Sequence, residues 1–121
     1  MFFPNPYTFS IMKIFAFRDR IGSEGKEFGR YHALDLYTIL ATTTEEEWRN
    51  ALKLANQQAY QPIAVEAGSL VTEHFSALDQ LGMVRLRESP YYRRELQLEE
   101  FMSILQELFP APSKAQYEKT S

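Results

Sequence analysis

The chain has 121 residues, of which 45% are hydrophobic and 24% charged, a balance typical of one globular domain. It has no cysteine, which excludes disulfides, a thiol nucleophile and a thiolate metal site and suits a reducing compartment. The net charge of -3 gives no long-range attraction to nucleic acid or to an anionic membrane. Nine Phe and seven Tyr predict an interior packed largely by aromatic side chains.

The N-terminal residues 1–17 are apolar but do not have the pattern of an export signal. They have no basic start, contain Lys13 and lack a small-residue cleavage site. No uncharged apolar run approaches the ~20 residues that cross a bilayer. We therefore expect a cytoplasmic protein without a membrane segment.

Helix signals begin at Asn5 and Pro6. Asn caps a helix start, and Pro is tolerated in the first turn because its missing N–H has no partner there. The first helix is predicted to run to about Ile21. Glycines break the pattern over residues 22–29, and a second helix is predicted over roughly residues 30–42.

The next two helices have clear start signals. Thr44 followed by Glu47 is a capping box, in which each side chain bonds the backbone N–H of the other residue. The third helix is therefore predicted to start there and to run to about Tyr60. Pro62 opens a fourth helix, and Gly82 is predicted to end it.

A β-hairpin is predicted near residues 83–95. Residues 84–87, Val-Arg-Leu-Arg, alternate as a short strand does, and residues 88–90, Glu-Ser-Pro, are typical of a turn.

The last helix is predicted over residues 98–109, and the polar tail over residues 110–121 is predicted to be disordered. The fold class is therefore all-α, with about five helices in an irregular bundle, one short hairpin and a single domain over residues 1–109.

Lys13 lies on a first helix that is otherwise largely apolar. A lysine there needs a partner, because an unpaired charge in a protein core is costly. Asp35, on the polar face of the second helix, is the natural partner if the two helices pack antiparallel. Taken alone, such a pair is more often a structural ion pair than part of an active site.

The pattern K-x-x-A-x-R-x-R starting at Lys13, followed by D-L-Y starting at Asp35, resembles the later motifs of abortive-infection (AbiE-type) nucleotidyltransferase toxins. The resemblance covers about residues 5–42. It implies that Lys13 lies near the nucleotide phosphates and that Asp35 belongs to the same cleft, so these two are the candidate catalytic residues. It also implies that Arg18 and Arg20 bind nucleotide phosphates.

This chain departs from the family pattern in two places. Tyr31-His32 stands where the family has Lys-Asp. Either His32 forms hydrogen bonds in place of the carboxylate, which makes it a candidate phosphate-binding residue, or this part of the site is lost. The family's metal-binding carboxylates and glycine-rich motif precede the lysine helix, whereas only residues 1–4 precede it here. The resemblance thus implies the C-terminal helical part of a truncated or split enzyme, inactive alone.

No cofactor is expected in this chain by itself. Mg²⁺ and a nucleoside triphosphate are expected only if a separately encoded nucleotidyltransferase core completes the site. With two histidines and no cysteine, a zinc site is not predicted, and His74 is interpreted as a half-buried core residue.

Two alternatives come from other function classes. The first is a winged-helix-like module that binds nucleic acid through Arg85, Arg87, Arg93 and Arg94, with tyrosines between them. The acidic helix before these residues argues against DNA, and a solvated hairpin paired with nearby glutamates explains them equally well. The second is an interaction module that forms a homodimer through its first helix, with an exposed patch of four phenylalanines: Phe2, Phe3, Phe9 and Phe17.

Overall fold

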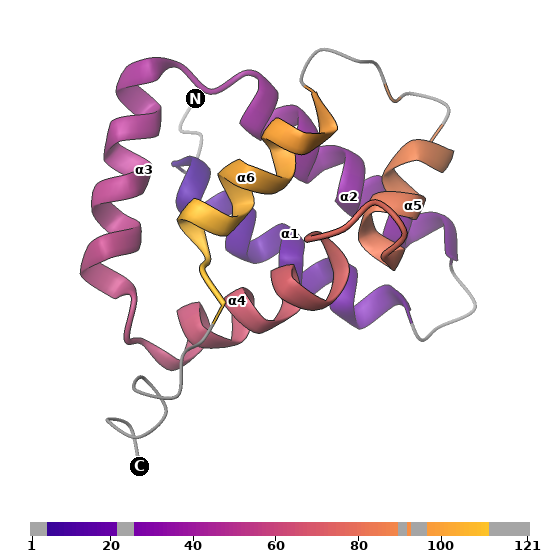
Figure 1. Ribbon diagram of the computed structural model, residues 1–121, viewed down its shortest axis with the longest axis horizontal. Coiled ribbons are helices and arrows are strands. Elements are labelled where there is room, and N and C mark those ends of the chain that lie inside the picture. The colour runs from indigo at the N-terminus through magenta and orange to yellow at the C-terminus, as the bar shows by residue number, and fades with distance from the viewer. Residues whose placement is uncertain (1–4, 22–25, 90–91, 93–96, 112–121) are drawn as a thin grey trace.

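The computed structural model describes residues 5–21, 26–89, 92 and 97–111, and for residues 26–29 the backbone alone. Over these residues the chain is all-α and contains no strand, which confirms the all-α part of the predicted fold. The described residues form six helices, one more than predicted (Figure 1): α1 (Pro6–Ile21), α2 (Lys26–Ala41), α3 (Glu45–Gln58), α4 (Pro62–His74), α5 (Leu81–Glu88) and α6 (Leu98–Leu108).

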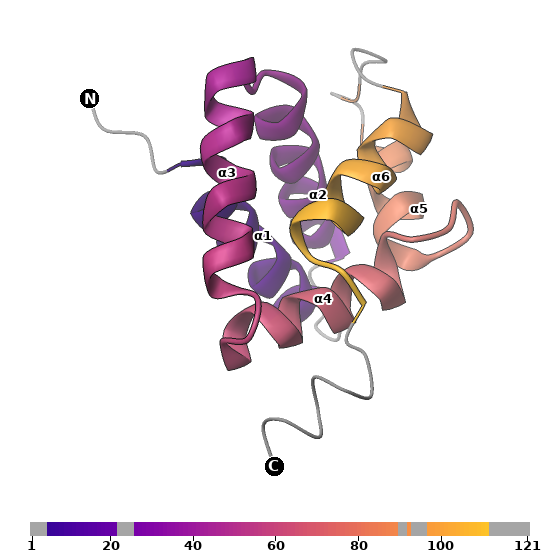
Figure 2. The ribbon, with the colours of Figure 1, turned by 60° about the vertical axis from the view of Figure 1, so that its left-hand side comes forward.

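Helices α1 and α2 form an antiparallel pair at the centre of the molecule (Figures 1 and 2). Helix α1 also packs against α3 and α4, so it is surrounded by other helices along much of its length. Helix α6 contacts α2, α3 and α4, and the short α5 lies against α2 and α4. The antiparallel pairing brings the polar positions of α1 and α2 together, which positions the candidate site.

Both predicted N-terminal capping signals are confirmed. The Asn5 carboxamide oxygen accepts a 2.9 Å hydrogen bond from the backbone N–H of Thr8, at the start of α1. At the start of α3, the N–H of Glu47 donates to Thr44 Oγ1 at 3.2 Å. The N–H of Thr44 in turn donates to the Glu47 carboxylate at 2.9 Å, which completes the capping box.

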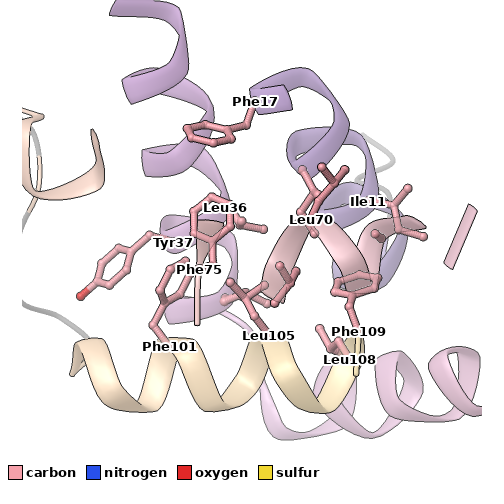
Figure 3. Close-up of a cluster of buried hydrophobic side chains, with 14 of the residues drawn as sticks. Ile11, Phe17, Leu36, Tyr37, Leu70, Phe75, Phe101, Leu105, Leu108 and Phe109 are labelled. Carbon is pink, nitrogen blue, oxygen red and sulfur yellow. The ribbon is translucent and has the colours of Figure 1, made fainter. Parts of the chain in front are cut away.

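An aromatic row runs through the core and joins five separate parts of the chain. Phe17 of α1 packs on Phe75 at the end of α4, with ring centroids 5.2 Å apart. Phe75 meets Phe101 of α6 edge-on at 6.3 Å, and Phe101 meets Tyr37 of α2 at 5.3 Å. Tyr37 in turn contacts Tyr92 at 5.3 Å. Figure 3 shows Phe17, Tyr37, Phe75 and Phe101 in one buried cluster, although they come from distant parts of the sequence. Aromatic packing therefore orders the interior as predicted.

The predicted end of the fourth helix is wrong. Helix α4 ends at His74, and a turn over residues 75–80 follows it. The Gln80 side chain stabilises this turn, since its carbonyl oxygen accepts hydrogen bonds from the N–H groups of Ser76 at 2.7 Å and Ala77 at 3.2 Å. Its amide nitrogen donates to the carbonyl of Thr72 at 3.1 Å. These Gln80 hydrogen bonds stabilise the turn that follows His74, so α4 ends earlier than predicted.

The predicted hairpin near residues 83–95 is also wrong, because residues 84–87 lie within helix α5. Met83 and Leu86, three residues apart, are both fully buried, which is the helical period rather than the strand period. Four alternating residues are too few to distinguish the two periods. The second half of the predicted hairpin lies mostly outside the described residues.

Gly82 lies in the first turn of α5 instead of ending a helix. A Cβ atom at this position would overlap the ring of Phe75 and the carbonyl oxygen of His74. The glycine therefore lets the start of α5 approach the end of α4 closely, and its small size rather than a helix-stop function explains it.

Two large apolar side chains are exposed in α4 and in the turn after it, Ile63 at 49% and Leu78 at 39%. None of the described helices is both long and apolar enough to cross a membrane. Of the tail predicted to be disordered, only Pro110 and Ala111 lie within the described residues.

Candidate functional site

An ion pair between α1 and α2 forms the centre of the candidate site. Lys13 Nζ lies 2.8 Å from Asp35 Oδ2, as the antiparallel pairing predicts. The lysine side chain is 21% exposed and the aspartate 49% exposed, so the pair lies at the edge of the helix interface, within reach of solvent. The ammonium group also lies 5.4 Å from the centre of the Phe9 ring, a favourable cation–π distance.

His32 belongs to the same surface, because it lies three residues before Asp35 on one face of α2. Burial lowers the pKa of the His32 imidazole below its ordinary value of 6.5. The positive charges of Lys13 and Arg20 lower this pKa further, and the negative charge of Asp35 acts in the opposite direction. Four ionisable side chains from two helices are therefore close enough to influence one another.

We call Lys13, Arg20, His32 and Asp35 the α1–α2 cluster. Arg20 follows Lys13 by seven residues, or about two helical turns, and its side chain is exposed. The Nδ1 atom of His32 is buried and has no hydrogen-bond partner among the described residues. The cluster thus contains two permanent cations, one carboxylate and a neutral imidazole with an unused polar atom. Chemically, it is suited to holding an anion at the surface.

Arg18, the other predicted phosphate ligand, lies on a different side of α1. Five residues along the helix place it about 140° around the axis from Lys13. Its guanidinium donates to Glu66 of α4 at 2.6 Å and to Asp19 at 3.2 Å, and it stacks 4.7 Å from the centre of the Phe15 ring. Arg18 therefore joins α1 to α4 and does not belong to the α1–α2 cluster.

The arginines of the winged-helix alternative are engaged within the chain where they are described. Arg85 pairs with Glu88 at 2.6 Å on the same helix. Arg87 donates to the backbone carbonyl of Leu78 at 2.6 Å, across the turn before α5. Arg93 and Arg94 lie outside the described residues. Residues 84–87 are helical, so they do not form the first strand of the predicted wing.

The remaining predicted residues are mainly structural. His74 is 7% exposed and meets the Phe17 ring at 5.4 Å, which confirms its place in the core. Burial lowers the pKa of this imidazole as well. Phe17 is only 1% exposed, so its predicted place in an exposed dimer patch is wrong. In the part of the chain that the structure describes, no three metal-binding side chains gather into one group.

The sequence did not predict a groove of about 490 Å³ between the end of α2, the start of α3 and one face of α6. Leu40, Trp48 and Ile104 contribute apolar surface to it. Trp48, which lines the groove, is partly buried. No local pattern signals this groove, because its walls come from three separate segments of the chain.

Comparisons of this chain with protein-family models, with curated proteins and with solved structures found no match.

Proposed function

We propose that the α1–α2 cluster binds the phosphates of a nucleotide and that the chain is the helical part of an AbiE-like nucleotidyltransferase. The single observation that carries the proposal is the 2.8 Å Lys13–Asp35 pair at an exposed helix junction, beside the unpartnered Nδ1 of His32. The sequence pattern around this pair, which resembles the AbiE-type motifs, supports the proposed relationship to that family. The fold supports the same interpretation, because the antiparallel helix pair brings Lys13 of the first motif segment against Asp35 of the second.

Each side chain has a distinct role in the proposal. Lys13 provides a compact positive charge to a phosphate oxygen, and Asp35 is a positioning residue that fixes the direction of the ammonium. Arg20 provides a planar guanidinium that can bind two phosphate oxygens at once. His32 accepts a proton when an anion approaches, because the anion's charge opposes the effect of the two neighbouring cations.

The proposal separates phosphate binding from chemistry. Nucleotidyl transfer requires Mg²⁺ held by carboxylates against the triphosphate, and we assign those carboxylates to a nucleotidyltransferase core outside this chain. The α1–α2 cluster would then complete the nucleotide site of that core. By itself, the chain is expected to bind polyphosphate without transferring a nucleotide.

Inorganic tripolyphosphate tests the binding step directly, because it carries the phosphate charges without a base or sugar. We expect calorimetry to detect binding that Lys13→Gln and Arg20→Gln each weaken by about ten-fold, since a hydrogen bond to a charged group contributes ~1.5–3 kcal/mol. Arg18→Gln is the matched control, because this arginine faces Glu66 instead. It should change the affinity less than two-fold, roughly the effect of one distant surface charge.

Equal losses in all three variants would show that only the general charge of the chain attracts the anion. Urea unfolding of each variant separates this result from a loss of fold. A second assay tests the division of roles. Magnesium-dependent nucleotide transfer by the purified chain, abolished by Lys13→Ala, would overturn the assignment of catalysis to a separate core.

A further inference from the structure

The groove between α2, α3 and α6 has the composition of a protein-binding surface. Its apolar wall is formed by Leu40, Trp48 and Ile104, and three carboxylates line it as well: Glu45, Glu100 and Glu107. Its volume of about 490 Å³ is enough to accept one or two large side chains. Apolar surface beside charged groups is the usual arrangement where an amphipathic segment docks.

The carboxylates of this groove are available to a partner. Glu45 pairs with Arg49 at 3.3 Å, but both side chains are more than 70% exposed, at 81% and 72%, so water screens this pair strongly. Among the described residues, neither Glu100 nor Glu107 forms an ion pair or a side-chain hydrogen bond. Glu100 and Glu107 therefore give the groove negative charge that no ion pair in the described part of the chain neutralises.

The groove is separate from the α1–α2 cluster and has the opposite charge. Leu40 follows Asp35 by five residues, which places it about 140° around α2 and about 7.5 Å further along the axis. A phosphate ligand is attracted to the cluster and repelled by the three glutamates. The two surfaces thus select different partners.

We propose that this groove binds a basic amphipathic helix of a partner protein. In this arrangement a large apolar side chain of the partner packs against Trp48 and Ile104. Lysines or arginines beside that side chain pair with Glu100 and Glu107, whose spacing of seven residues equals two turns of α6. Charge complementarity favours a basic partner, because an acidic segment would be repelled by these carboxylates and a purely apolar segment would leave them unpaired.

Trp48 provides the measurement, because it is the only tryptophan in the chain and lines the groove. The probes are three tryptophan-free peptides of about four helical turns with the same apolar face. Their polar faces carry lysine and arginine, glutamate, or glutamine. A fourth peptide has the basic composition in an order without helical periodicity. We expect the basic amphipathic peptide to shift the emission of Trp48 and to bind at least about ten-fold more tightly than the other three.

Neighbouring residues of α6 provide matched variants. Glu100 lines the groove, whereas Glu99 is exposed on the same turn and does not line it. Glu100→Lys should weaken binding of the basic peptide by about ten-fold and Glu99→Lys by less than about three-fold, because the latter acts only through screened charge. Ser103→Arg, which places a large cation in the groove, should abolish the change in Trp48 emission. Circular dichroism and urea unfolding check the fold of each variant.

Three results would overturn the proposal. The first is that the basic peptide binds no more tightly than its aperiodic counterpart. The second is that Glu100→Lys and Glu99→Lys weaken binding equally. The third is that binding leaves Trp48 emission unchanged. Any of these shows that general electrostatic attraction, rather than the groove, accounts for the contact.

Discussion

Lys13 and Asp35 connect the two central helices through one 2.8 Å ion pair, with the aspartate half exposed and the lysine largely covered. The pair lies where α1 and α2 present polar side chains to solvent beside the buried face that they share. Its position combines two properties. The helix interface restricts the ammonium, while the surface leaves it accessible to a ligand.

A double-mutant cycle tests the energetic coupling of this pair. Lys13→Gln, Asp35→Asn and the double variant should give a coupling free energy of about 0.5–1 kcal/mol, the range for partly exposed pairs. Screening should reduce the coupling in 1 M salt, where the Debye length is about 3 Å. Urea unfolding at low and high salt measures both values. A coupling near zero at low salt would mean that the two charges do not interact in solution.

Acid should destabilise the protein through its histidines. Burial lowers the pKa of His74 below the ordinary value of 6.5, so the unfolded chain binds more protons than the folded one between these values. Stability is therefore complete above about pH 7 and falls as the pH decreases through 6.5 toward the lowered pKa. Because His32 also has a lowered pKa, it adds to the same trend.

Urea unfolding at pH 7.5 and pH 5 checks this prediction. The free energy of unfolding should be lower at pH 5, and His74→Phe should reduce the difference between the two values. The effect of Glu47 on stability can be separated from that of the histidines. Its hydrogen bonds to Thr44 lower the pKa of this carboxyl below 4.5, so its protonation destabilises the protein only at more acidic pH. An unchanged pH dependence in His74→Phe would contradict the assignment.

Thr44→Ala should destabilise the domain by about 1 kcal/mol, because it removes the side-chain half of a capping box. Thr38→Ala is the control, since Thr38 is an exposed residue within α2 and not at a helix start. It should change the stability by less than about 0.5 kcal/mol. Denaturant midpoints of the two variants give the comparison. Equal effects would show that the cap does not contribute in solution.

Gly68→Ala should destabilise the protein, although alanine is the better helix former by about 1 kcal/mol. A Cβ atom at Gly68 would overlap the backbone carbonyl oxygen of Pro110, which packs on this face of α4. Because backbone gives way less easily than a flexible side chain, we expect a net loss of about 1–3 kcal/mol. The adjacent Ser69→Ala should be nearly neutral or slightly stabilising. Thermal unfolding measures both, and a more stable Gly68→Ala variant would show that the Pro110 contact yields.

Local chemistry was enough to predict where α1 and α3 begin, but not the starts of α2 at Lys26 and of α5 at Leu81. Asn5 and Thr44 cap their helices with their own side chains, so the signal and its effect lie within four residues of each other. The end of α4 was not predictable in this way. Gln80 bonds backward to Thr72, and Gly82 fits against Phe75, which are contacts that form only when the chain has already turned.

In the candidate site, too, some contacts could be predicted from the sequence and others could not. The Lys13–Asp35 pair was predictable because a lysine on an apolar helix requires a partner and the next helix offers one. The ion pair of Arg18 with Glu66 was not, because it depends on how α4 crosses α1. The groove beside Trp48 was likewise invisible in the sequence, since three separate segments form its walls.

The aromatic row from Phe17 through Phe75 and Phe101 to Tyr37 makes the last helix as necessary as the first. Without α6, the faces of Phe75 and Tyr37 that meet Phe101 would be left in water. A truncated chain that ends before Leu98 should therefore be poorly ordered and prone to aggregate, rather than forming a smaller stable domain. The buried backbone amides of α1 and α6 should exchange hydrogen for deuterium at similar rates, because the two helices unfold as one cooperative unit although they are far apart in the sequence.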